Sequence, residues 1–199
     1  MNPLTSVKGT IASGFILAIV VALYLSPENS YLITRNLSIW MHALAGVTWV
    51  GLLYYFNFVQ VPAMADALAD EGGPGPAAIG KYVAPRALLW FRMASAVTWL
   101  TGAWALSISP QYGFVETFIF QAPAGHMMSL GSWMGTIMLF NVWVLIWPNQ
   151  KKVLGMVEAT AEEIAKAKFT AAMASRTNVV LSVPMLLCMV GAGHGGYLF

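Results

Sequence analysis

Long apolar runs alternate with short charged stretches along the 199 residues of the chain. A helix needs about 20 apolar residues to cross the hydrocarbon of a bilayer. Five segments approach or exceed this length, and we predict that each is a membrane-spanning helix. Their expected bounds are residues 9–25, 38–60, 85–108, 127–147 and 178–199. The pattern therefore predicts an all-α integral membrane protein, a bundle of five transmembrane helices that forms a single domain over residues 1–199.

The positive charges are concentrated in alternate connections between these segments. With the N-terminus inside, every lysine and arginine except Arg35 lies on the inner side. Because Lys and Arg favour the cytoplasmic side, we predict that the N-terminus is inside and the C-terminus outside. The inner connection 150–177 is rich in alanine, and Glu162 and Lys166 have helical i,i+4 spacing. We expect a helix there that lies on the membrane surface or extends the fourth span inward.

Composition agrees with a membrane location and excludes several classes of protein. The chain is 58% hydrophobic and 9% charged, whereas a soluble domain carries about 25% charged residues. The basic residues are scattered over connections instead of forming one basic face, so no nucleic-acid partner is expected. Cys188 is the single cysteine, which excludes an intrachain disulfide, and no Cys-x-x-Cys-His motif is present to attach a c-type haem.

All three histidines are expected near the outer ends of the spans. His42 is four residues into the second span, His194 is five residues before the end of the fifth, and His126 directly precedes the fourth. At 1.5 Å rise per residue, His42 and His194 would each lie roughly 6–8 Å below the outer boundary. Imidazole is a common ligand of haem iron, copper and zinc. The three histidines are therefore candidate metal ligands at one depth.

Small residues flank two of these histidines. Gly46 follows His42 by one helical turn, and Gly191 and Gly195 lie on either side of His194. They would let a porphyrin lie against the backbone, and they would equally let two helices pack closely. Since ionisable groups inside membranes are usually functional, we favour a haem b site with His42 and His194 as axial ligands. The alternative is a pair of interfacial histidines that bond only to backbone.

Methionine suggests a second cofactor. The chain has 12 methionines, and Met41 adjoins His42 while Met127 adjoins His126. Methionine and histidine together suit copper, although methionine is also an adaptable apolar side chain. Copper handling is therefore the alternative to a haem protein. A third alternative is a non-catalytic accessory subunit of a larger membrane complex.

A second polar set is expected toward the inner ends of the spans. It consists of Asn57, Arg92, Asn141 and Asn178. Unpaired polar groups are costly in hydrocarbon, so these side chains should meet inside the bundle. Hydrogen bonding between helices is the favoured interpretation. A polar pocket for a small anionic molecule is the alternative.

Three motifs resemble the bacterial membrane-bound urate hydroxylase family, whose membrane part is the urate oxidase N-terminal domain. They cover residues 40–62, residues 141–152, and residues 174–185 with the downstream His194. The resemblance implies a bacterial inner membrane protein that oxidises urate and passes electrons to c-type cytochromes. Because Cys-x-x-Cys-His is absent, the chain resembles a short form without the cytochrome c domain.

A short form would need a separate electron-transfer partner. The resemblance and the histidines together predict a membrane haem b redox protein that exchanges electrons with a periplasmic c-type cytochrome or another subunit of a respiratory complex. The chain contains no flavin or nucleotide fingerprint and no evident acid–base pair. Whether it is itself an oxidoreductase of the urate hydroxylase type is therefore left open by the sequence.

Overall fold

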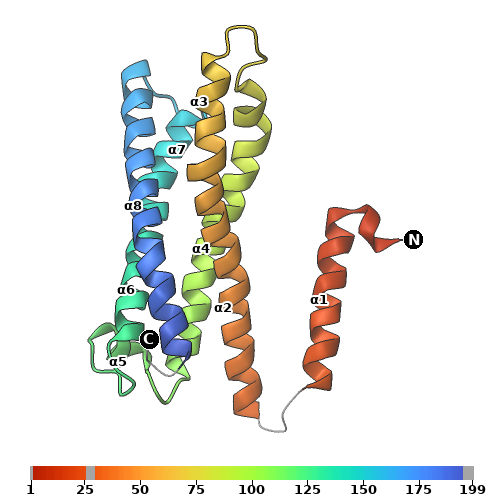
Figure 1. Ribbon diagram of the computed structural model, residues 1–199, viewed down its shortest axis with the longest axis vertical. Coiled ribbons are helices and arrows are strands. Elements are labelled where there is room, and N and C mark those ends of the chain that lie inside the picture. The colour runs from red at the N-terminus through yellow and green to blue at the C-terminus, as the bar shows by residue number, and fades with distance from the viewer. Residues whose placement is uncertain (1, 26–29, 195–199) are drawn as a thin grey trace. The chain divides into compact units, whose positions relative to one another are not determined.

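Every regular element in the described part of the chain is helical. The computed structural model describes residues 2–25 and 30–194 (Figure 1). Four helices are long and apolar enough to cross a membrane: Val7–Tyr24, Tyr31–Ala69, Met127–Val153 and Ala161–Gly193. The prediction of an all-α, multi-pass membrane protein is confirmed at this level. The chain divides into two compact units, residues 1–37 and 38–199.

The first unit contains α1, Val7–Tyr24, which corresponds to the predicted span 9–25. Its mean hydropathy is 1.9, and the hydroxyl of Ser6 accepts a hydrogen bond from the N–H of Gly9 to cap its first turn. Capping by serine satisfies a donor that the helix itself leaves unpaired. A short 3-10 helix, Pro3–Thr5, precedes α1.

The second unit holds the antiparallel bundle. Helix α2, Ser30–Tyr55, enters it at Ser38 and continues through the π-helical segment η2 into α3. In chain order, the elements after α2 are η2 Phe56–Gln60, α3 Val61–Ala69, η3 Ile79–Val83, α4 Ala84–Ser107, α5 Phe114–Phe118, α6 Met127–Phe140, η4 Asn141–Ile146, α7 Trp147–Val153 and α8 Ala161–Gly193.

Each π-helical segment ends two residues before a proline. Pro62, Pro85 and Pro148 follow η2, η3 and η4 in this way. A proline ring in a helix clashes with the carbonyl four residues earlier and lacks an N–H to bond it. In the wider π turn the N–H groups reach back five residues, as from Val61 to the carbonyl of Phe56. The helix can therefore continue past each proline without a break.

Helix α4 matches the predicted third span in position but not in apolarity. It has 24 residues, yet it is not among the four helices that meet the length and hydropathy expected of a membrane span. Arg92 and several threonine and tryptophan residues lower its mean hydropathy. The count of five spans and the orientation of the termini therefore stay predictions.

Helix α8 is longer than the predicted fifth span, which was expected to begin at residue 178. The helix expected within residues 150–177 is confirmed from Ala161, where it continues into the predicted fifth span, while α7 extends the fourth span inward to Val153. Thr160 and Glu163 form a capping box at the start, with Thr160 N–H to Glu163 Oε2 at 2.9 Å and Glu163 N–H to Thr160 Oγ1 at 3.2 Å. Neither glycine nor proline interrupts residues 161–183. At 33 residues α8 is about 50 Å long, well beyond the thickness of the hydrocarbon.

The capping box provides a local test of this helix start. Replacing Thr160 by alanine removes the acceptor for the Glu163 N–H, and the first turn should lose about 1 kcal/mol of stability. Hydrogen exchange of the amides after Thr160 should accelerate about fivefold, while exchange in the rest of α8 stays unchanged. Thr177→Ala is the matched control, because the Thr177 hydroxyl bonds only the Met173 carbonyl of its own helix. Equal exchange in both variants would contradict the capping role.

The bundle has two chemically different ends. Figure 1 shows the start of α4, α7 and the start of α8 at one end, and the end of α4, the start of α6 and the end of α8 at the other. The first carries Lys81, Lys151 and Lys166 and is called the lysine-rich end. The second carries His126 and His194 and is called the histidine end. Leu53, Met138 and Val142 are almost completely buried between the ends.

Candidate functional site

His42 is held against α4 by a hydrogen bond through one ring nitrogen. Its Nδ1 lies 2.8 Å from the carbonyl oxygen of Thr98. A carbonyl only accepts, so Nδ1 carries the hydrogen and donates it, and the lone pair of the neutral ring is on Nε2. Metal-binding histidines show this arrangement, in which a backbone carbonyl fixes the tautomer and the orientation of the ring. In the neutral ring, this hydrogen bond leaves the Nε2 lone pair of His42 available to a metal.

His194 repeats the arrangement at the end of α8. Its Nδ1 lies 2.8 Å from the Val190 carbonyl oxygen, one turn earlier in the same helix, and the side chain is exposed. His194 is the C-cap of α8, and its own N–H bonds the Gly191 carbonyl at 3.1 Å. Tyr112 donates its hydroxyl to the Ala192 carbonyl at 3.0 Å, which anchors this helix end to the loop before α5. The Nε2 of His194 is likewise left as an acceptor.

The register of the helices places His42 and His194 at the same level. Helices α2 and α8 are antiparallel, and the Tyr54 hydroxyl is 2.9 Å from Ser182 Oγ. His42 lies 12 residues before Tyr54, and His194 lies 12 residues after Ser182. Both stretches are free of π turns, so the same rise of about 18 Å separates each histidine from this contact.

His126 lies at that level too. A Cβ on Gly131 would lie 3.1 Å from Met189 Cε, which sets the register of α6 against α8. His126 is five residues before Gly131, and His194 is five residues after Met189. His126 is the N-cap of α6 and is exposed, with its ring 5.9 Å from that of Phe120. The three histidines thus lie at one level of the bundle, and their depth below a membrane boundary stays a prediction.

The glycines near the histidines differ in what surrounds them. Gly46 faces α4, where an added Cβ would make an ordinary contact of 3.7 Å with Thr98 Cγ2. Gly191 is buried in α8, and Gly195 lies outside the described residues. Gly102 was not predicted as a site residue, yet a Cβ there would lie 2.9 Å from both Nδ1 and Cε1 of His42. The close approach of α2 to α4 at His42 therefore depends on Gly102.

A signal for this part of the site was present in the sequence. Small residues recur along one face of α4, and such faces permit close helix contacts in membranes. They are Ser95, Thr98 and Gly102. Their spacing indicates where another helix can approach, but not which side chain it brings.

Two of the inner polar residues bond directly to each other. Asn141 Nδ2 donates to Asn178 Oδ1 at 2.8 Å, and Asn178 Nδ2 donates to the Met138 carbonyl at 3.0 Å. Asn178 is 0% exposed. Asn57 Nδ2 donates to the Ser175 hydroxyl at 2.8 Å and to the Leu53 carbonyl at the same distance. These bonds join η2 and η4 to α8, as the interpretation of helix packing expects.

Arg92 is not bonded to these asparagines. Its guanidinium carbon lies 3.5 Å from the centroid of the Trp147 ring, at the lysine-rich end. The four residues of the predicted polar pocket are therefore divided between two places. Asn57 and Asn141 bond residues of α8, and Asn178 is part of α8. Arg92 stacks on Trp147 instead. A pocket for an anionic molecule among them stays a prediction.

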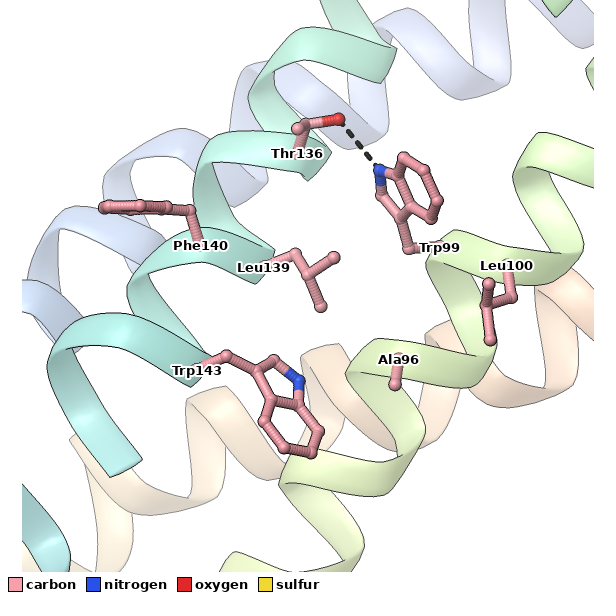
Figure 2. A pocket seen from close by; sticks show the side chains of 7 residues that line it. All are labelled: Ala96, Trp99, Leu100, Thr136, Leu139, Phe140 and Trp143. Carbon is pink, nitrogen blue, oxygen red and sulfur yellow. Dashed lines mark hydrogen bonds between the residues drawn. The ribbon is translucent and has the colours of Figure 1, made fainter. Parts of the chain in front are cut away.

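A separate cavity lies between α4 and the α6–η4 helix. It has a volume of about 430 Å³ and is lined by Ala96, Trp99, Leu100, Thr136, Leu139, Phe140 and Trp143. Figure 2 shows these side chains from the two facing helices, with Trp99 Nε1 bonded to the Thr136 hydroxyl at 2.9 Å. Trp143 Nε1 reaches Ser95 Oγ at 3.3 Å. With both indole donors engaged, the cavity wall is apolar, and it includes none of the predicted site residues.

The donor set at the histidine end suits haem. Among residues 2–25 and 30–194, no group of three or more His, Cys, Asp or Glu side chains could hold a metal ion. Haem iron needs only one or two axial side chains from the protein, because the porphyrin supplies the other four ligands. An imidazole whose Nδ1 bonds a backbone carbonyl, as in His42 and in His194, is therefore a donor of the type that haem iron accepts.

A comparison with known families gives a match over the C-terminal part of the chain. Residues 107–199 match the urate oxidase N-terminal family. The urate oxidase N-terminal match includes α6, η4, α7 and α8, and with them His126, His194, Asn141 and Asn178. The predicted resemblance is thereby confirmed for this part of the chain. His42, Asn57 and Arg92 lie before the matched residues, and neither the curated proteins nor the solved structures gave a match.

Proposed function

We propose that the protein is a membrane haem b redox protein in which His42 and His194 are the axial ligands. The observation that carries the proposal is the shared state of the two imidazoles: each donates Nδ1–H to a backbone carbonyl at 2.8 Å and keeps Nε2 as an acceptor. The register places both at one level of the bundle. A haem bound there would supply one-electron redox chemistry.

The roles of the surrounding residues follow from their contacts. The Thr98 carbonyl orients His42, the Val190 carbonyl orients His194, and the hydroxyl of Tyr112 holds the end of α8 in place. A hydrogen bond from the ring nitrogen that does not bind the metal makes a ligating imidazole more basic and thereby changes the affinity and redox properties of the metal site. Gly102 leaves the space in which the His42 ring sits.

The proposed setting is a bacterial inner membrane with the histidine end on the periplasmic side. The charge bias supports this orientation, because the lysine-rich end would be cytoplasmic. Electrons would pass between the site and a separate c-type cytochrome or another subunit of a respiratory complex. The urate oxidase N-terminal match supports urate oxidation as the coupled reaction.

Spectroscopy with metal analysis of the purified protein tests the proposal. We expect a b-type optical spectrum and one iron per chain or fewer, without copper. His42→Ala and His194→Ala should each remove most of the bound haem. His126→Ala is the matched control at the same level, and it should keep the spectrum because the His126 ring contacts only Phe120 among the interactions described for it.

Other outcomes would change the assignment. Haem retained in both His42→Ala and His194→Ala would overturn the ligand pair. Copper at one equivalent without iron would favour the copper-handling alternative, which the methionines beside His42 and His126 support. Urate consumption is measured in membranes that contain the haem-loaded protein and a c-type cytochrome. If no urate is consumed, urate oxidation is rejected as the coupled reaction, while the proposed haem redox role stands.

A further inference from the structure

At the lysine-rich end, two cations approach one indole ring. Arg92 of α4 stacks on Trp147 with its guanidinium carbon 3.5 Å from the ring centroid. Lys151, one turn after Trp147 in α7, has its Nζ 5.8 Å from the same centroid. The adjacent Lys152 is different, because it pairs with Glu163 at 3.5 Å. Within the described residues, no carboxylate forms an ion pair with Arg92 or Lys151.

The stacking leaves the N–H donors of the Arg92 guanidinium available to a ligand. A cation–π contact occupies the face of the guanidinium, whereas its five N–H donors lie in the plane and point outward. Within the described part of the chain, none of these donors has a hydrogen-bond partner, and Arg92 is only partly buried. The in-plane donors form a fork that matches the oxygens of a phosphate or carboxylate. Held flat by Trp147, the fork is oriented before any ligand arrives.

The position of Trp147 along its helix indicates the depth in a membrane at which the Arg92 guanidinium would lie. Helix α6 begins at Met127, at the histidine end, and Trp147 follows 20 residues later through η4. That stretch rises about 30 Å, which equals the thickness of the hydrocarbon. Trp147 therefore lies at the opposite membrane boundary, where tryptophan rings sit at the level of the lipid headgroups. Phosphates of phospholipids occupy that level.

We propose that Arg92 and Lys151 bind the phosphate of an anionic phospholipid headgroup, with Trp147 orienting the guanidinium. Basic groups on the cytoplasmic side of membrane helices bind anionic headgroups for the same electrostatic reason. The two cations come from α4 and α7, so a bound headgroup would bridge two helices that are distant in sequence. The site is independent of the haem at the opposite end, and either assignment can fail without the other.

Lipid titration of the full-length protein in detergent micelles tests the proposal. Phosphatidylglycerol, phosphatidylcholine and inorganic phosphate are added separately, and binding is followed by native mass spectrometry and by the midpoint of thermal unfolding. Wild-type protein should bind phosphatidylglycerol in preference to phosphatidylcholine. Arg92→Gln should weaken phosphatidylglycerol binding about tenfold, since a charge-assisted two-pronged contact is lost. Lys151→Gln should weaken it about threefold through the loss of one flexible charge.

The controls separate a site from general attraction to positive charge. Lys168→Gln removes one exposed charge from α8 and should leave phosphatidylglycerol binding unchanged. Equal affinity for phosphatidylglycerol in wild type and in a folded Arg92→Gln or Lys151→Gln variant would overturn the proposal. So would equal binding of phosphatidylcholine by wild type. Stabilisation by inorganic phosphate at the same concentration as the lipid would assign the fork to free phosphate instead.

Discussion

Gly102→Ala is expected to lose most of the haem proposed above while the protein stays folded. The new Cβ would lie 2.9 Å from Nδ1 and Cε1 of His42, closer than side chains tolerate, and the imidazole must move. Its movement breaks the bond to the Thr98 carbonyl, which orients the ring. Changes to such supporting contacts lower metal affinity by about 10–100-fold. The ratio of haem to protein in the purified variant measures the effect.

Gly51→Ala is the matched control for this substitution. Gly51 lies on α2, where an added Cβ would meet no atom within 4 Å. Alanine favours a helix over glycine by about 0.5–1 kcal/mol, so this variant should be slightly more stable and retain the proposed haem at the wild-type level. If Gly102→Ala retained as much haem as Gly51→Ala, His42 would not be a ligand in the orientation described above.

Asn178→Leu is expected to lower the free energy of unfolding by about 2 kcal/mol. Leucine has the same number of side-chain heavy atoms as asparagine but no polar group, so the substitution leaves the buried Asn141 amide without its acceptor. It also removes the bond to the Met138 carbonyl. Titration with sodium dodecyl sulfate in mixed micelles, followed by circular dichroism, measures the change.

A double-mutant cycle separates the asparagine pair from general packing. Asn141→Leu with Asn178→Leu should be less damaging than the two single changes added together, because no unpaired partner remains. Thr177→Val, at an exposed neighbouring position, is the control and should change stability by less than about 0.5 kcal/mol. Strict additivity of the two asparagine substitutions would contradict the direct bond.

The depth of the histidines could be predicted from the sequence, whereas their partners could not. Hydropathy and the constant rise of a helix locate His42 and His194 along their spans. The Thr98 carbonyl and Gly102 beside His42 depend on how α2 packs on α4, and a single sequence carries little information on that packing. The asparagines were correctly expected inside the bundle, but the pairing of Asn141 with Asn178 required the register of α6 and η4 against α8.

The start of α8 was missed even though its signal was visible. Thr160 and Glu163 have the spacing of a capping box, and an alanine-rich stretch without glycine or proline follows. The predicted start of the fifth span at residue 178 relied on apolar length, which marks where a helix enters hydrocarbon and not where it begins, and the helix expected within residues 150–177 was not joined to it. The π turns had no comparable local signal apart from the prolines that follow them.

These three π turns bear on how relatives of this chain should be compared. A π turn accommodates one extra residue within a helix, so every later side chain is rotated by about 100° relative to an uninterrupted helix. A homologue that lacks the proline after η4 could dispense with that residue and still present the same surface to α8. Alignment of the two would then need a gap of one position inside a continuous helix. Without that gap, the homologue's counterpart of Asn141 would be equated with Val142, which is buried in the core and makes no side-chain hydrogen bond.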